Sequence, residues 1–244
     1  MKKIKNIIFI TIIIFFSFTL QCQPLHKNNF INIHALYIQA QNKLKNQKFI
    51  DAITILKNIN KINVMKFDND KIQMNLIYAY YKNSNFYKAQ EKIKIFKKLY
   101  PQHKNIDYIL YIESLIYIKL DQNIYFKYIP IKYYQQDPIY AMKAFFQLKN
   151  IIFNYPNSVY LINIKKDIAC VKNRLAMHYF QILKYYFLKK EYISVINRGD
   201  DIIKKYPDTL IIQKTLLLME KSYRILHIIK TANTISNIIK SNPI

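Results

Sequence analysis

Apolar residues recur every three to five positions between residues 34 and 59, with polar residues filling the intervals. This spacing places the apolar side chains on one face and is typical of amphipathic helices. The periodicity breaks around Asn46 and Gln47, so we predict two helices separated by a turn. The apolar face consists of Leu36, Ala40, Leu44, Phe49, Ala52, Leu56 and Ile59.

The same frame returns 37 residues further along the chain, in the segment LIYAYYKNSNFYKAQEKIKIFKKLYP. The corresponding pairs are Phe49 and Phe86, Ala52 and Ala89, and Leu56 and Ile93. A tetratricopeptide repeat of about 34 residues has this pattern, with a small residue where its two helices cross and a proline after the second helix. The pattern therefore predicts tetratricopeptide repeats.

A spacing of twelve residues separates the crossing residue from a following proline in four places, namely Ala89–Pro101, Ala144–Pro156, Val195–Pro207 and Thr231–Pro243. Proline cannot continue a helix and disfavours helical backbone at the residue before it. We predict that Tyr100, Tyr155 and Tyr206, each directly before a proline, end the second helices and fill the grooves between repeats. A ligand-binding role is the less favoured alternative, because regularly spaced aromatic residues usually form core.

Two stretches exceed the length of a repeat. Residues 121–138 break the periodicity and contain two prolines, which predicts a long loop and a candidate contact surface. From residue 159 to residue 189 the helical spacing continues, which predicts one long helix. Its apolar face consists of Leu161, Ile164, Ile168, Val171, Leu175, Tyr179, Ile182 and Tyr186.

These patterns predict an all-α protein, a tetratricopeptide-repeat helical solenoid of about five repeats and roughly ten helices in a right-handed superhelix. Stacking covers the apolar face of each repeat and leaves a concave groove, a surface that usually binds peptides or proteins. We divide the chain into a signal peptide (1–21), a tether (22–33), N-terminal repeats (34–120), the loop (121–138) and C-terminal repeats (139–244).

The N-terminus predicts export. Three lysines precede fourteen mostly apolar, uncharged residues at 7–20, which is typical of a signal peptide and too short for a spanning helix of about 20 residues. Cys22 follows where a bacterial lipoprotein carries its lipid, although Thr19 and Gln21 depart from the usual motif. Gln23 favours the outer membrane. The alternative is an ordinary signal peptide with an incidental cysteine.

Composition changes this picture little. The formal net charge of +24 is compatible with nucleic-acid binding, but lysine, asparagine, isoleucine and tyrosine are all abundant together, which indicates a general compositional bias. The predicted export also argues against nucleic acid as a partner. With Gly199 as its single glycine, the chain has no phosphate-binding loop. Cys170 lies in an apolar helical pattern, so we expect a buried free thiol.

The sequence offers no candidate catalytic or metal site. The five histidines form no His-x-x-x-His pair, and neither cysteine lies beside one. The 14 acidic residues are spread along the predicted helices, so no pair of carboxylates can be assigned to acid–base chemistry. We expect a protein without enzymatic activity and without a cofactor, apart from a covalent lipid on Cys22.

Several segments together resemble the BamD family, the lipoproteins of the outer-membrane β-barrel assembly (Bam) machinery. The resemblance runs from about His34 to the C-terminus, in addition to the signal peptide and Cys22. The most specific segments are LIYAYYKN (76–83), NIDYILY (105–111), YPNSVY (155–160), VKNRLA (171–176) and VINRGDDIIKKYPDT (195–209).

The resemblance implies a five-repeat solenoid at the periplasmic face of the outer membrane. Its C-terminal repeats would bind the periplasmic POTRA domains of BamA, and its N-terminal repeats would receive the C-terminal signal of unfolded barrel precursors. Other Bam lipoproteins are further possible partners. The family's interface arginine corresponds to Arg198, next to Asn197, and we expect Asp200 and Asp201 to hold its guanidinium in place.

The chain departs from the family pattern at residues 60–70, where the usual Tyr-Pro and glycine are missing, and in the tyrosine-rich loop 121–138. Recognition of precursor signals and contacts of that loop are therefore not carried over. The alternative function is a general periplasmic scaffold lipoprotein for envelope or cell-wall enzymes, which would share the anchor and the groove but would not depend on Arg198.

Overall fold

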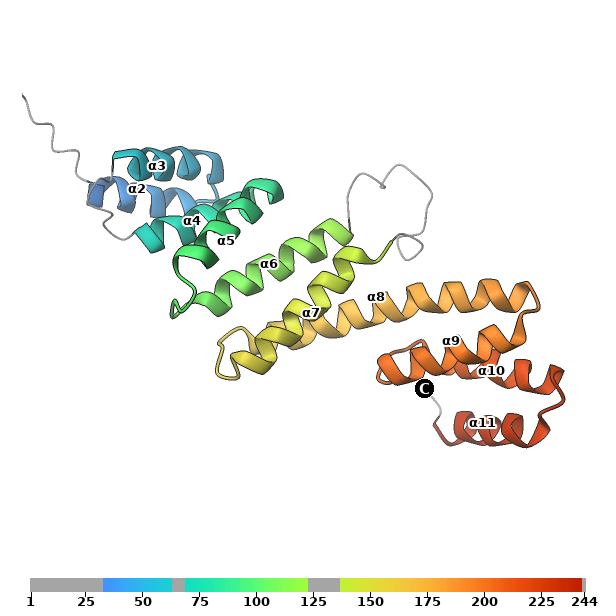
Figure 1. The fold of residues 1–244 in the computed structure, drawn as a ribbon. Coiled ribbons are helices and arrows are strands. Elements are labelled where there is room, and N and C mark those ends of the chain that lie inside the picture. The colour runs from blue at the N-terminus through green and yellow to red at the C-terminus, as the bar shows by residue number, and fades with distance from the viewer. Residues whose placement is uncertain (1–32, 63–68, 123–136, 243–244) are drawn as a thin grey trace, which may run out of the picture.

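The computed structural model describes residues 33–62, 69–122 and 137–242 (Figure 1). These residues form ten α-helices and no β-strand, which confirms the all-α class. The predicted signal peptide, Cys22 and most of the loop 121–138 lie outside the described residues. The helices are α2 (Ile33–Lys45), α3 (Phe49–Ile62), α4 (Asn69–Lys82), α5 (Phe86–Leu99), α6 (Ile106–Asp121), α7 (Ile139–Asn154), α8 (Leu161–Leu188), α9 (Tyr192–Lys205), α10 (Ile212–Ile225) and α11 (Ile229–Ser241).

Each helix packs mainly on its neighbours in the sequence, and the helices follow one another along an elongated molecule (Figure 1). Two pairs of helices that are not neighbours in the sequence also touch, namely α4 with α6 and the long helix α8 with α10. This arrangement confirms a helical solenoid of the tetratricopeptide type; its handedness stays a prediction. Within the described residues, no helix combines the length and apolar character that crossing a bilayer requires.

Four of the helix pairs are joined by the same tight turn. Gln47, Ser84, Lys190 and His227 each have a positive φ, between 56° and 63°, two residues after the first helix of a pair ends. Their amides and those of the next residues donate back to the last turn, as in Lys190 to the Phe187 carbonyl and Glu191 to the Tyr186 carbonyl. This is the Schellman end of a helix, which usually carries glycine. Here other residues take the strained position.

The tyrosine–proline pairs end helices as predicted. Tyr100, Tyr155 and Tyr206 follow α5, α7 and α9, and each donates its amide to the carbonyl four residues earlier. Their φ values, between −130° and −136°, leave the helical region before the proline. Tyr206 is buried, whereas Tyr100 and Tyr155 pack half-buried against the core.

Small residues occupy the helix crossings, with one correction. Ala52, Ala89, Ala144 and Val195 are fully buried, as the repeat frame requires. In α11, however, the buried crossing residue is Ala232, and Thr231 is only half-buried. The prediction of Thr231, which was based on the twelve-residue spacing to Pro243, was therefore wrong by one position. The crossing is identified instead by the preceding turn, because Ala232 is five residues after His227 and Ala52 is five after Gln47.

Helix α8 confirms the predicted long helix, but its buried face differs in part. Ile164, Val171 and Leu175 are buried as expected, while Phe180 and Leu183 replace the predicted Tyr179 and Ile182. The same face also buries Arg174, whose Nε lies 3.1 Å from Oδ2 of Asp121 at the end of α6. Cys170 is exposed, so the expectation of a buried thiol was wrong.

Candidate partner-binding site around Arg198

Arg198 lies on α9 against the C-terminal part of α8. The turn at Lys190 reverses the chain, so that residues before and after it face each other. The Arg198 guanidinium carbon lies 4.3 Å from the centre of the Tyr186 ring. A guanidinium over an aromatic face is attracted by the negative ring face, and its planar side can stack while its N–H groups remain directed outward. Tyr186 therefore supports Arg198 in a half-buried position.

The two neighbouring carboxylates do not have the predicted role. Asp200 faces Lys204 and Asp201 faces Lys205, with oxygen–nitrogen distances of 3.9 and 3.8 Å. These pairs are four residues apart along exposed faces of α9, where such interactions are weak. Arg198 is thus positioned by an aromatic ring and not by Asp200 or Asp201. Asn197, the other predicted contact residue, is exposed beside it.

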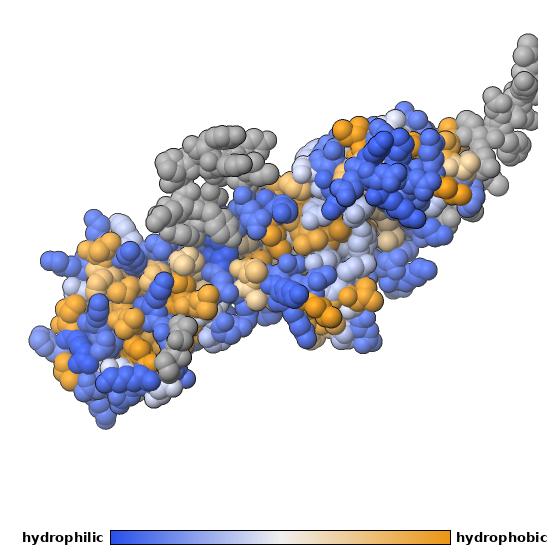
Figure 2. Space-filling model, turned by 180° about the vertical axis from the view of Figure 1, so that it is seen from behind, coloured by the Kyte–Doolittle hydropathy of each residue, from blue (hydrophilic) through white to orange (hydrophobic). Residues whose placement is uncertain are grey.

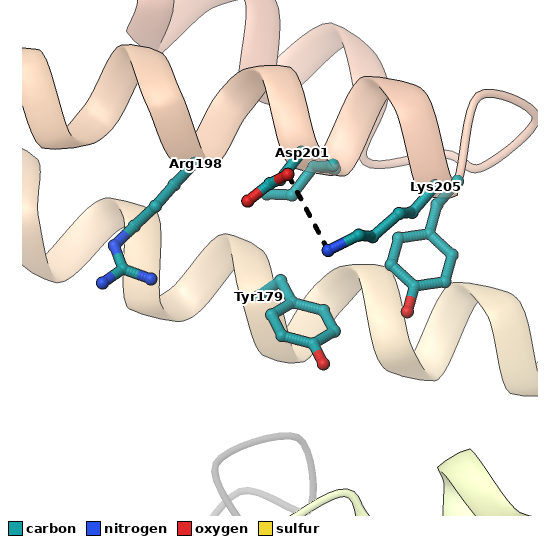
Figure 3. Close-up of a pocket in the computed structure, with 6 residues that line it drawn as sticks. Tyr179, Arg198, Asp201 and Lys205 are labelled. Atoms are coloured by element: carbon teal, nitrogen blue, oxygen red, sulfur yellow. Dashed lines mark ion pairs between the residues drawn. The ribbon is translucent and has the colours of Figure 1, made fainter.

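A shallow pocket opens next to Arg198 between α8 and α9 (Figure 3). Arg198, Asp201 and Lys205 project from α9, and Tyr179 lies below them on α8. The Tyr179 and Tyr206 rings stack with centroids 5.9 Å apart, and Phe145 contacts Tyr206 edge-on. The pocket thus has an aromatic floor and a charged rim. Its lining residues are Tyr179, Arg198, Asp201, Ile202, Lys205 and Tyr206.

Burial raises the pKa of Tyr206 to about 12, with a smaller contribution from neighbouring Tyr179. The phenol therefore remains protonated at neutral pH and can donate a hydrogen bond. Together with Arg198 and Lys205, it gives the pocket donors and positive charge. Such a surface suits a carboxylate or carbonyl oxygen of a protein partner.

Gly199 fixes the position of α9 against α10. A Cβ atom at Gly199 would come within 2.3 Å of Sδ and 2.5 Å of Cγ of Met219. The buried Met219 side chain thus occupies the space above the glycine. The single glycine of the chain serves close approach of two helices, and it lies directly beside Arg198.

A second set of aromatic side chains connects the first helices of successive repeats. We call Tyr78, Tyr81, Tyr108, Tyr111 and Tyr160 the tyrosine cluster. Tyr160 lies with its ring centre 5.5 Å from those of both Tyr108 and Tyr111. The Tyr111 hydroxyl donates to Oδ2 of Asp167 over 2.8 Å. Burial raises the pKa of Tyr111, and this hydrogen bond raises it further. Burial and the neighbouring Tyr160, Tyr78 and Tyr81 raise the pKa of Tyr108, which places the two tyrosines of α4 near it. The cluster thus links α4 and α6 to Tyr160, directly before α8, and Tyr111 is buried within it.

Within the described residues, no three His, Cys, Asp or Glu side chains gather as metal ligands would. Two such side chains meet where Nε2 of His103 lies 3.0 Å from Oδ2 of Asp70. This contact links α4 to the turn before α6. Cys22, the predicted lipidation site, lies outside the described residues and stays a prediction.

Comparison with known proteins decides the family. Residues 31–238 match the YfiO family, described as an outer membrane lipoprotein. The chain belongs to the BamD family. It is 47% identical over its whole length to the outer membrane protein assembly factor BamD of Buchnera aphidicola, which it also covers completely. The same protein of Vibrio cholerae is 29% identical over 86% of this chain and 87% of its own length.

Membership in the BamD family assigns the chain to the outer membrane, as an assembly factor for outer membrane proteins. The Neisseria meningitidis BamD is 25% identical over 86% of this chain. The family match contains the pocket at Arg198 and the tyrosine cluster. The resemblance inferred from the repeat segments is therefore confirmed, while the roles of individual residues are not decided by it.

Proposed function

We propose that the protein acts without catalysis in the Bam complex, by binding the POTRA domains of BamA through the α8–α9 surface around Arg198. The observation that supports this is the position of Arg198 over Tyr186, at 4.3 Å from the ring centre, beside a pocket with tyrosines as its floor. Arginine and tyrosine in a partly desolvated pocket are typical of residues that dominate binding energy at protein interfaces.

The tyrosine cluster supports a second contact, with unfolded barrel precursors. All of its rings except that of Tyr111 are half-buried and present apolar area, and the hydroxyls of these four tyrosines can pair with the backbone of an extended chain. Lys82 lies 6.0 Å from the centre of the Tyr78 ring at one end of the cluster. The lipid on Cys22 would hold both surfaces at the periplasmic face of the outer membrane. Contacts with other Bam lipoproteins remain part of this proposal.

Binding of residues 23–244 to the POTRA domains of BamA from the same organism tests the proposal. Arg198→Leu is expected to weaken binding at least tenfold, which corresponds to about 1.4 kcal/mol. Arg198→Lys keeps the charge but loses the planar fork, so we expect an intermediate loss. Arg224→Leu is the matched control, because Arg224 is an exposed arginine on α10 that pairs with Glu220.

Equal losses for Arg198→Leu and Arg224→Leu would show a general charge effect and would remove Arg198 from the interface. Absence of binding by a folded protein would favour the general envelope scaffold, which requires no contact of Arg198 with BamA. Circular dichroism of each variant establishes that the helices are retained.

A further inference from the structure

The end of the α7–α8 hairpin carries an unusual group of exposed apolar side chains. Phe153, Val159 and Ile162 are 85%, 82% and 73% exposed, which makes them three of the four most exposed large hydrophobic side chains among the described residues. Phe146, seven residues before Phe153 on the same face of α7, is 64% exposed. We call these four residues the hairpin patch. Single exposed apolar residues are normal, but a concentration of them usually marks a binding surface.

The repeat itself does not require this patch. The other two tyrosine–proline turns have the same backbone hydrogen bonds, so their residues can be compared position by position. Around Tyr100 the equivalents of the patch are Glu91, Lys98, Lys104 and Asp107, and around Tyr206 they are Asn197, Lys204, Leu210 and Gln213. Seven of these eight residues are polar. The apolar side chains are therefore a property of this one turn and not of helix packing.

Lysines surround the patch without acidic residues between them. From residue 139 to residue 166 the chain contains Lys143, Lys149, Lys165 and Lys166 and no aspartate or glutamate. Lys149, Lys165 and Lys166 are exposed. Two carboxylates lie nearby: Asp107 of α6 accepts a hydrogen bond from Ser158 in the turn, and Asp167, directly after Lys166, accepts one from Tyr111. The surface thus combines large apolar side chains with an excess of positive charge.

Figure 2 shows hydrophobic surface interrupted by hydrophilic side chains at the lower middle of the molecule, where the α7–α8 turn of Figure 1 projects. Aromatic and aliphatic side chains among lysines are the combination with which proteins lie on anionic bilayers. Lysines near such a surface are attracted to its negatively charged phosphates. Since the chain belongs to a family of outer membrane lipoproteins, a bilayer surface is close to it.

We infer that the hairpin patch is a second membrane contact, which lies on the anionic phospholipid surface to which the protein is attached. The lysines bind lipid phosphates, while Phe153, Val159 and Ile162 enter the boundary between headgroups and acyl chains. This contact fixes the orientation of the solenoid on the membrane, which attachment at a single lipidated residue does not. It does not depend on the contact proposed for Arg198.

Tryptophan fluorescence tests the inference directly, because the chain contains no tryptophan. Full-length Phe153→Trp is reconstituted into vesicles of phosphatidylethanolamine and phosphatidylglycerol, with no other protein present. Its emission is expected to move to shorter wavelength. Lipids brominated on their acyl chains should quench it about twofold or more, since interfacial side chains enter roughly 5–10 Å into the boundary. Lys98→Trp, the equivalent position in the preceding turn, should show neither effect.

The anionic component is tested separately. Replacement of phosphatidylglycerol by phosphatidylcholine, or the combined change Lys149→Glu, Lys165→Glu and Lys166→Glu, should reduce the quenching of the tryptophan at position 153. Unchanged quenching in both cases would overturn the role of charge. If the Phe153→Trp variant has the same emission wavelength as the Lys98→Trp variant and is not quenched, the membrane contact is overturned. The hairpin patch would then be a binding surface for a protein. All substituted side chains are exposed, so the fold should be retained.

Discussion

At the scale of single residues, buried polar groups hold repeats together where the sequence predicts only apolar faces. Glu113 of α6 accepts from Nζ of Lys97 on α5, at 2.9 and 3.0 Å, and from the Gln147 amide on α7, at 3.2 Å. Arg174 and Asp121 are 3% and 5% exposed and join α8 to α6. Such pairs fix register between helices more than they add stability.

Arg174→Met should therefore destabilise the protein by about 3–5 kcal/mol, because it removes the guanidinium that pairs with the buried Asp121 carboxylate. Adding Asp121→Leu should recover much of this loss, since both charges are then replaced by apolar groups. Urea unfolding of the two variants and the parent measures the difference. A double variant as unstable as the single one would contradict this explanation.

Gly199→Ala tests the close approach of α9 and α10. Because the added methyl would overlap Met219, we expect destabilisation of about 1–3 kcal/mol, reduced in part by the better helix propensity of alanine. In a Met219→Ala background the same change should cost less or become stabilising. A thermal-unfolding cycle over the four proteins measures this coupling. Equal effects of Gly199→Ala in both backgrounds would show that Met219 is not the obstacle.

At the scale of helices and turns, the helix pairs are defined more by backbone geometry than by residue identity. Four different residue types adopt positive φ in the same Schellman turn, although an L-residue in that region is strained by about 1–2 kcal/mol. The chain contains a single glycine, Gly199, and none of these turns uses it. We infer that packing of the paired helices against each other offsets the cost of the positive φ in these turns.

Replacing Lys190 with glycine should relieve this strain. We expect a gain of about 0.5 kcal/mol, since the relief exceeds the entropy that glycine loses on folding. Lys189→Gly is the control, because Lys189 has a φ of −80° and glycine brings no relief there. Thermal unfolding compares the two variants. Destabilisation by both would show that the Lys190 side chain has a role beyond the turn.

At the scale of the whole molecule, the fold could be predicted from repeated spacing, whereas contacts between distant residues could not. The interruptions between helices at Gln47 and at the three tyrosine–proline pairs could be predicted, because they follow from local rules of the backbone. The support of Arg198 by Tyr186, and the burial of Arg174, depend on how α8 rotates against its neighbours. That rotation buries Phe180 and Arg174, two residues outside the face that the spacing predicts.

The tyrosines distributed over the solenoid make its stability sensitive to alkaline pH. Burial raises the pKa of Tyr117 and Tyr206 to about 12, from an ordinary value of 10. A raised folded-state pKa contributes stability below the unfolded value, and this contribution is lost as pH rises from about 10 to about 12. We expect the free energy of unfolding in urea to fall across this window.

Tyr206→Phe should make that fall less steep, because one of the groups that ionise more readily in the unfolded chain is removed. Tyr87→Phe, at an exposed tyrosine on α5, is the matched control for loss of a phenol hydroxyl. Identical slopes for all three proteins would mean that Tyr206 does not contribute to the pH dependence.

The unbroken length of α8 sets a spacing within the assembly. Ile162 lies near its start and Tyr186 near its end, and the rise of 1.5 Å per residue separates these positions by about 36 Å. If the start of the helix rests on lipid, a partner held over Tyr186 by Arg198 is kept at a defined distance from that contact. Helix α8 then acts as a rigid spacer, and inserting or deleting whole helical turns in it would move the partner without altering either contact.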